Sequence, residues 1–190
     1  MTDGDSATNE GPASGDGAAT GDDYVDSYED VSMFVLSDER EQTLLDTQTE
    51  CVFMWTTDAG DPVGVYMNFV ERDGSIWLTC TRRRKRVRAL EKRPRGSVAV
   101  SSRGTDIGIS QAVTYKGDVV IHDDPETLTW MYRALAEKVR PGDPANQDAF
   151  VHHLESPGRV VLELRPDTRI GFDSEAMFAN SPAGPSATRV

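Results

Sequence analysis

The residues of this chain that point most directly to chemistry are basic, and they gather in one short stretch. Nine of the fourteen residues in 82–95 are Lys or Arg, and Glu91 is the one acidic residue among them. The nine are Arg82, Arg83, Arg84, Lys85, Arg86, Arg88, Lys92, Arg93 and Arg95. A strand-like run over 75–80 precedes a short helix that Pro94 ends. Because a helix N-terminus presents free N–H groups and a positive dipole, this junction favours an anion such as phosphate.

Two hydroxyl groups support the same interpretation, and two other interpretations compete with it. Thr79 and Thr81 stand just before the basic stretch and could donate to a phosphate. The first alternative is a solvated charged helix face, which the charge pattern alone allows equally well. The second is nucleic-acid binding, which is disfavoured because the rest of the domain is acidic and no aromatic residues interleave with the arginines.

Other residue types that carry chemistry form no recognisable constellation. His122, His152 and His153 lack the companions that a metal site needs, so no metal is predicted. Cys51 and Cys80 are too few for a disulfide framework. No Ser-His-Asp set, carboxylate pair or Cys-His pair stands out. That absence is consistent with a reaction carried by a cofactor, for which the chain supplies binding, orientation and electrostatics.

Composition divides the chain into a tail and a folded domain. Residues 1–30 hold nine acidic residues and no Lys or Arg, and they are predicted to be a disordered acidic tail. The whole chain has 20 basic and 32 acidic residues; without the tail the balance is 20 against 32 − 9 = 23, a net charge of −3. The Pro-, Ala- and Ser-rich end over 177–190 is predicted to be a loose tail, which leaves 31–176 as the domain. No apolar run suggests a signal peptide or a membrane span, so a cytoplasmic protein without a membrane partner is expected.

The domain reads as short strands with peripheral helices. Helices are expected over 37–48, with Ser37 as N-cap, over 125–139 after an acidic cap and Pro125, and near 146–155. Strands are expected over 51–57, 62–70, 75–80, 97–102, 109–121 and 159–164, with a further edge strand at 168–172. The first three are expected to form an antiparallel meander. Six strands with turn signals predict a closed barrel or a sandwich, and no Gly-rich dinucleotide loop follows any strand.

The order of these motifs resembles the FMN-binding split-barrel superfamily, which includes pyridoxamine 5′-phosphate oxidase and the actinobacterial deazaflavin-dependent oxidoreductases. In that family a basic residue about eight positions before a proline binds the cofactor phosphate. Counting back from Pro94 places Arg86 in that position, with Lys85 beside it and Arg88 further along the helix. Asp61-Pro62, the stretch from Val113 to Asp118, the run 158–163 and Ile170-Gly171-Phe172 resemble the other family segments. The resemblance covers about residues 33–175.

The resemblance implies a six-stranded antiparallel split β-barrel, mainly β with peripheral helices, that works as a homodimer with the cofactor bound between the subunits. The implied cofactor is FMN or coenzyme F-420, ahead of haem, which some branches bind. Ser101 and Ser102 at the end of the fourth strand, and Gln111 at the start of the fifth, would lie near the flavin ring. The arginine-histidine signature of true pyridoxamine 5′-phosphate oxidases is missing at the C-terminal end, so vitamin B6 oxidation is not implied.

Three functions follow as hypotheses. The leading one is an oxidoreductase that transfers a hydride between the bound flavin or deazaflavin and a small organic substrate. The second is a non-catalytic carrier or sensor of flavin or haem. The third is an interaction domain whose basic helix meets an acidic partner. Strands that are apolar on both faces, such as 62–70, independently favour a homodimer, because both faces need cover. The alternative is that a helix of the same chain, such as 125–139, covers the second face.

Overall fold

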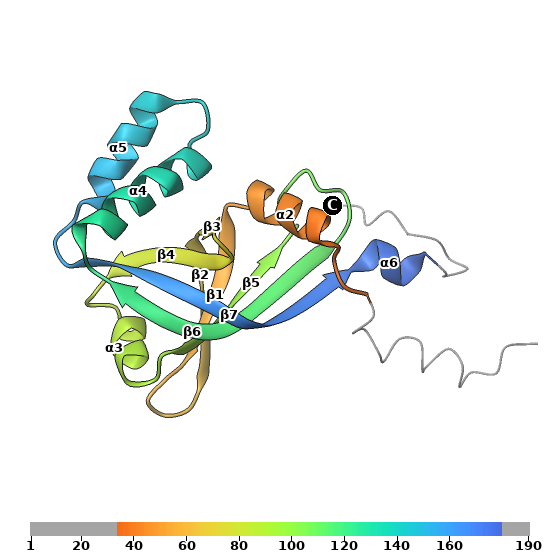
Figure 1. The fold of residues 1–190 in the computed structure, drawn as a ribbon, viewed down its shortest axis with the longest axis horizontal. Coiled ribbons are helices and arrows are strands. Elements are labelled where there is room, and N and C mark those ends of the chain that lie inside the picture. The colour runs from red at the N-terminus through yellow and green to blue at the C-terminus, as the bar shows by residue number, and fades with distance from the viewer. Residues whose placement is uncertain (1–33, 180–190) are drawn as a thin grey trace, which may run out of the picture. The chain divides into compact units, whose positions relative to one another are not determined.

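The computed structural model of the chain describes residues 34–179. It contains one antiparallel sheet of seven strands with helices around it (Figure 1). The strands are β1 (Glu50–Thr56), β2 (Pro62–Asn68), β3 (Val70–Arg72), β4 (Ser75–Thr81), β5 (Arg95–Ser101), β6 (Gln111–His122) and β7 (Arg159–Asp173). The helices are α2 (Asp38–Thr47), α3 (Lys85–Lys92), α4 (Pro125–Val139), α5 (Pro144–Leu154) and α6 (Ser174–Phe178). The expected tail over 1–30 and residues 180–190 lie outside the described residues.

The hydrogen-bonding order of the strands requires the sheet to curl. The order is β2-β1-β5-β6-β7-β4-β3, so β2 and β3 form its two opposite edges. These edge strands are nevertheless joined by one residue, Phe69, which is fully buried. Opposite edges can be one residue apart only if the sheet rolls up on itself. The antiparallel split barrel expected from the sequence is therefore confirmed.

Two strand predictions differ from the structure in detail. The strand expected over 62–70 is divided at Phe69, and this division raises the number of strands from six to seven. The expected meander holds for its first step, because β1 and β2 pair antiparallel, and is wrong for its second, because β4 pairs with β7 and with the short β3 and not with β2. The segments expected at 159–164 and 168–172 form one continuous strand, β7.

The barrel interior is filled by alternate side chains of the strands. Its largest buried residues include Phe53 of β1, Leu78 of β4, Val98 of β5 and Leu162 of β7. A second apolar cluster lies on the outer side, where Met131 and Leu135 of α4 cover Val161 and Trp77. The N-terminal half of β7 is therefore buried on both faces. In the described residues no helix is long and apolar enough to cross a membrane.

The longest strands, β6 and β7, meet at a bulge that needs glycine. Their register shifts between Lys116 and Gly117, where Asp167 is left without a partner. A Cβ atom built on Gly117 would lie 1.9 Å from the carbonyl oxygen of Arg165. The backbones approach closely here because Gly117 has no side chain.

Helix boundaries follow their capping residues. The Ser37 hydroxyl accepts a hydrogen bond from the Arg40 amide at 3.3 Å, and the Asp124 carboxylate accepts one from the Thr127 amide at 2.8 Å. The helices predicted at these caps are confirmed, α4 over its whole predicted range. Helix α6, which the sequence did not indicate, extends ordered structure to Phe178.

A half-buried lysine connects α4 to the barrel edge. Lys138 Nζ donates to the carbonyl oxygen of Leu45 in α2 at 2.7 Å and lies 3.7 Å from the ring centroid of Phe69. Burial lowers the pKa of Lys138 to about 8. The one ammonium group thus holds three elements together, while burial disfavours its charge.

We expect this lysine to make stability depend on pH. Its folded pKa lies below the unfolded value, so between these two values the unfolded chain binds the extra proton and stability rises with pH. Relative to Lys138→Met, the unfolding free energy of the wild type should rise by about 2 kcal/mol between about pH 7.5 and about pH 10. Urea denaturation at the two pH values measures the difference. Equal pH dependence of the two proteins would contradict the assignment.

Candidate cofactor site

The basic stretch lies where β4 passes into α3. Strand β4 ends at Thr81, and α3 begins four residues later with Val87, Ala89 and Leu90 buried against the barrel. The N-cap residue, Arg84, has extended backbone angles and makes no side-chain capping hydrogen bond. The first N–H groups of α3 are therefore open to an external acceptor.

Ion pairs divide the basic residues into two groups. Arg82 pairs with Glu91 and Asp123, and Lys92 and Arg93 both pair with Asp58. Arg95 pairs with Asp118 and Asp167. Within residues 34–179 the remaining five have no carboxylate partner: Arg83, Arg84, Lys85, Arg86 and Arg88. The C-terminal end of α3 is thus neutralised, and its N-terminal end keeps an excess of positive charge.

Arg86 differs from the other unpaired residues because its side chain is partly buried. Its guanidinium carbon lies 5.5 Å from the ring centroid of Trp55, and its Nη1 lies 2.6 Å from the sulfur of Met67. Burial lowers the pKa of Arg86, which means that its charge is poorly solvated. A thioether and an aromatic face compensate a cation weakly. A phosphate oxygen would compensate it much better.

The two threonines of the predicted site differ in whether their hydroxyl groups are free to bind a phosphate. The Thr79 hydroxyl donates to the carbonyl oxygen of Val160 at 2.9 Å, so its proton is already engaged between β4 and β7. The backbone carbonyl of Thr81 accepts from the Arg84 amide at 3.0 Å, which places Thr81 beside the start of α3. The structure therefore leaves Thr81 next to the start of α3 and engages the Thr79 hydroxyl elsewhere.

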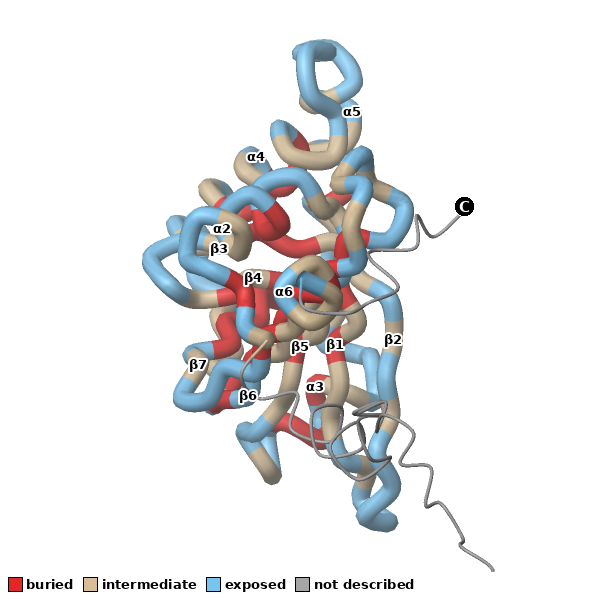
Figure 2. The backbone as a smooth tube through the Cα atoms, turned by 90° about the vertical axis from the view of Figure 1, so that its right-hand side faces the viewer, coloured by how far each residue is buried: buried red, intermediate tan, exposed pale blue. Residues whose placement is uncertain are grey.

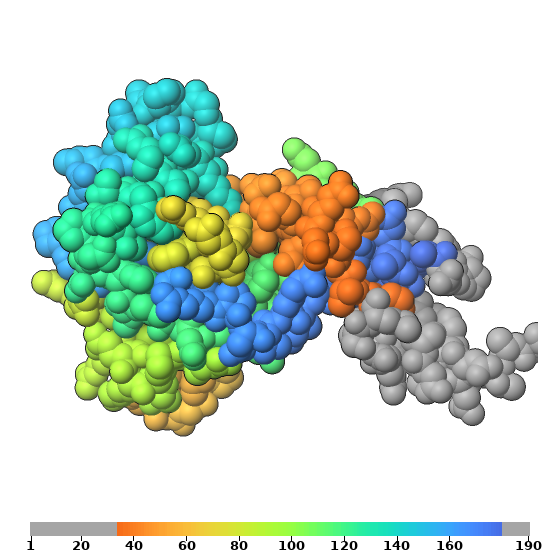
Figure 3. Space-filling view, in the orientation of Figure 1, coloured from red at the N-terminus to blue at the C-terminus, as the bar shows by residue number. Residues whose placement is uncertain are grey.

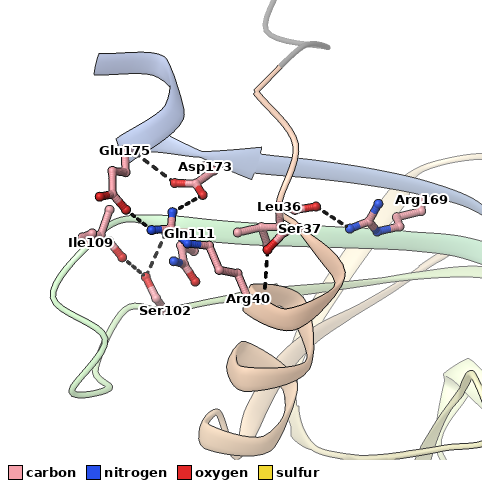
Figure 4. Close-up of polar contacts among 9 residues, drawn as sticks. All are labelled: Leu36, Ser37, Arg40, Ser102, Ile109, Gln111, Arg169, Asp173 and Glu175. Carbon is pink, nitrogen blue, oxygen red and sulfur yellow. Dashed lines mark hydrogen bonds and ion pairs between the residues drawn. The ribbon is translucent and has the colours of Figure 1, made fainter. Parts of the chain in front are cut away.

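The three residues expected near the flavin ring lie at the other end of β5. Ser102 donates to the carbonyl oxygen of Ile109 at 2.8 Å and accepts from the Gln111 amide at 3.0 Å (Figure 4). The Ser101 hydroxyl accepts from the Arg103 amide at 3.3 Å. Both hydroxyls thus shape the β5–β6 loop. From Arg95, just beyond α3, to Ser101 is about 20 Å along the strand.

Gln111 is 5% exposed and lies beside a polar cluster that sequence reasoning missed. There Arg40 of α2 binds the buried carboxylate of Asp173 and also Glu175 (Figure 4). Because the partners are more than 130 residues apart in sequence, no local signal could have indicated the cluster. No local signal indicated the positions of Trp55 and Met67 either, which β1 and β2 place around Arg86.

The outer face of the sheet carries an uncovered apolar row. Paired positions across five strands bring together Tyr66, Val52, Ala99, Thr114 and Ile170. Tyr66 is 78% and Ile170 54% exposed. Figure 2 shows that β2 is not buried anywhere along its length. This face has the composition of a contact surface.

No group of three or more His, Cys, Asp or Glu side chains in 34–179 lies close enough to hold a metal ion. His122 instead contacts the buried carboxylate of Glu163 at 2.9 Å. Although burial opposes it, hydrogen bonds from Arg165, His122 and Ser75 lower the pKa of Glu163. This cluster joins β4, β6 and β7.

Comparison with known proteins identifies the family. The family model described as pyridoxamine 5′-phosphate oxidase matches residues 37–170, which is more than half of the chain. The protein therefore belongs to the pyridoxamine 5′-phosphate oxidase family. No curated protein shows significant sequence similarity to it.

Solved structures agree with the fold at low sequence identity. A conserved hypothetical protein, Rv2991, from Mycobacterium tuberculosis is 18% identical, with a TM-score of 0.66 over 76% of this chain and 89% of that one. HutZ, the heme storage protein from Vibrio cholerae, is 13% identical, with a TM-score of 0.55 over 70% and 94%. A protein described as F420 reductase is 20% identical, with a TM-score of 0.50 over 67% and 94%. At these identities the likeness supports the split-barrel fold alone.

Proposed function

We propose that the protein is a flavin- or deazaflavin-dependent oxidoreductase that transfers a hydride between the bound cofactor and a small organic substrate. The observation that carries this proposal is the basic end of α3, where Arg86 is half-buried and has no carboxylate partner among residues 34–179. Family membership and the likeness to an F420 reductase support it. FMN and coenzyme F-420 are both candidates for the cofactor.

The residues at the start of α3 fit a phosphate group. Arg86 would give bidentate hydrogen bonds, Lys85 and Arg88 would add positive charge, and the N–H groups of the first turn would donate from the backbone. Thr81 would add a hydroxyl donor. A bound flavin or deazaflavin would supply the hydride chemistry on its ring. The task of the chain is then to hold the phosphate, orient the ring and keep water away from it.

We further propose that two copies form a homodimer through the outer face of the sheet. The row from Tyr66 to Ile170 needs cover, and a second copy of the same face could provide it by two-fold symmetry. In this arrangement the cofactor lies in the groove between the subunits, with its phosphate on α3 of one chain and its ring against the other. The interface should reach the standard size of about 1,600 Å².

The dimer can be tested with a substitution that does not disturb the monomer core. Ile170→Asp introduces a charge at a position that is 54% exposed in the monomer. Burying this unpaired charge in a dimer would cost several kcal/mol, so the variant should be monomeric at micromolar concentration, where the wild type is dimeric. Light scattering measures the mass. Thr43→Asp, on the exposed side of α2, is the matched control and should stay dimeric. A monomeric wild type with cofactor bound would contradict the proposal.

The second candidate function is a non-catalytic carrier or sensor of haem or flavin. The fold it shares with HutZ favours this candidate. Absorbance titration of the purified protein with FMN, coenzyme F-420 and haemin separates the cofactors. Reoxidation of the reduced, bound cofactor by unsaturated organic substrates then separates an enzyme from a carrier. Binding of haemin alone would overturn the proposed oxidoreductase.

A further inference from the structure

Apart from the candidate cofactor site, the structure has a pocket between helices α4 and α5. Helices α4 and α5 run side by side at one end of the barrel (Figures 1 and 3). Between them and the start of β7 is a pocket of about 510 Å³. Its walls include Leu128 and Tyr132 of α4, Val151 of α5, and Ser156 and Arg159 of the loop and strand that follow. A pocket of this size suits a small organic molecule.

One wall of this pocket carries a tyrosine that can donate a hydrogen bond. Tyr132 is 6% exposed and lines the pocket, and its hydroxyl makes no hydrogen bond within residues 34–179. Its hydroxyl is not among the fully buried polar atoms of this part of the chain, so an external acceptor can reach it. Burial raises the pKa of Tyr132, so the group remains a donor near neutral pH. The pocket therefore contains a hydroxyl group that can donate a hydrogen bond to a ligand.

The positive charge of the pocket comes from one arginine. Arg159 uses its Nε to bind the Ser156 hydroxyl at 3.2 Å, and its two other nitrogens have no partner in the described residues. Arg82, which also lines the pocket, is paired with Asp123 and Glu91. Glu155 at the rim lies 3.4 Å from a ring nitrogen of His152. Arg159 is thus the cation of this pocket that can bind an anion.

We propose that this pocket binds a small carboxylate with an apolar body. Arg159 and Tyr132 would donate to the carboxylate oxygens, and Leu128, Val151 and Pro125 would contact the apolar part. The pocket does not include Lys85, Arg86 or Arg88, so this ligand would bind apart from the cofactor phosphate. The proposal does not depend on the proposed hydride transfer.

Calorimetry with phenylacetate tests the pocket, and phenylacetamide is its neutral counterpart. Phenylacetate should bind saturably and at least about tenfold more tightly than the amide, because the amide cannot pair with Arg159. Arg159→Gln should weaken phenylacetate binding about tenfold and Tyr132→Phe about fivefold. Arg140→Gln, at the far end of α4, is the matched control and should bind phenylacetate like the wild type. Near-UV circular dichroism checks that each variant is folded.

The same variants distinguish this pocket from the cofactor site. Arg86→Ala should leave phenylacetate binding unchanged, and Tyr132→Phe should leave FMN binding unchanged. Equal affinity for phenylacetate and phenylacetamide would overturn the proposal. So would an unchanged phenylacetate affinity in folded Arg159→Gln and Tyr132→Phe, or no saturable binding by the wild type. None of these results would bear on the cofactor assignment.

Discussion

Replacing Arg86 with alanine should weaken FMN binding by about 1.5–3 kcal/mol, which is the usual contribution of a hydrogen bond to a charged group. In the structure this guanidinium is half-buried between Trp55 and Met67 and has no carboxylate partner in residues 34–179. A phosphate would therefore meet a cation that is already desolvated and positioned. Calorimetric titration of wild type and variant with FMN, and with coenzyme F-420 in parallel, measures the loss.

Arg133→Ala is the matched control for the change in net charge. Arg133 lies on α4, pairs with Asp148 and is remote from α3 in the chain. Its removal should alter FMN affinity by less than about 0.5 kcal/mol, since an exposed, distant charge is screened by salt. If Arg86→Ala binds both cofactors as tightly as Arg133→Ala does, the basic end of α3 is a solvated face and holds no phosphate.

Introducing a side chain at Gly117 should cost at least about 3 kcal/mol of unfolding free energy. The added Cβ of Gly117→Ala would lie 1.9 Å from a backbone carbonyl oxygen of β7, an approach that no side-chain rearrangement can relieve. The bulge between β6 and β7 would have to open, and these strands form the centre of the sheet. Urea denaturation of the purified variant gives the free energy.

Gly108→Ala provides the comparison within the same molecule. Nothing lies within 4 Å of a Cβ at this position, and its backbone does not adopt a positive φ angle. Its stability should stay within about 0.5 kcal/mol of the wild type. Equal stability of the Gly117 and Gly108 variants would show that the close approach of β6 and β7 is not a constraint on the fold.

The sequence was most informative where local chemistry decides the structure. An acidic cap followed by Pro125 predicted the start of α4, and Ser37 predicted the start of α2. The division at Phe69 could not be predicted, because apolar residues continue through it and closure of the barrel ends β2. The sequence also did not indicate that β7 continues through Pro166, because a proline usually interrupts a strand. Strand β4 pairs only as far as Leu164, so the missing N–H of Pro166 breaks no ladder bond on that side.

The sequence predicted the type of the candidate site but not which of its basic residues are paired with carboxylates. The concentration of charge indicated an anion site at the start of α3. Which charges remain available depends on Asp58 and Asp123, which pair with residues of the basic stretch from other parts of the fold. The role of Ser102 was equally hidden, because its bond to Ile109 exists only once the β5–β6 loop is folded. Long-range pairing, rather than residue type, decides which polar groups stay free.

Titration with FMN and with riboflavin tests the central claim most directly, because the two differ only in the phosphate. If the unpaired basic end of α3 holds the phosphate, FMN should bind at least about tenfold more tightly than riboflavin, a difference of about 1.4 kcal/mol or more. This preference should disappear in Arg86→Ala. Quenching of flavin fluorescence measures both dissociation constants. Equal affinity of the wild type for FMN and riboflavin would contradict the phosphate site.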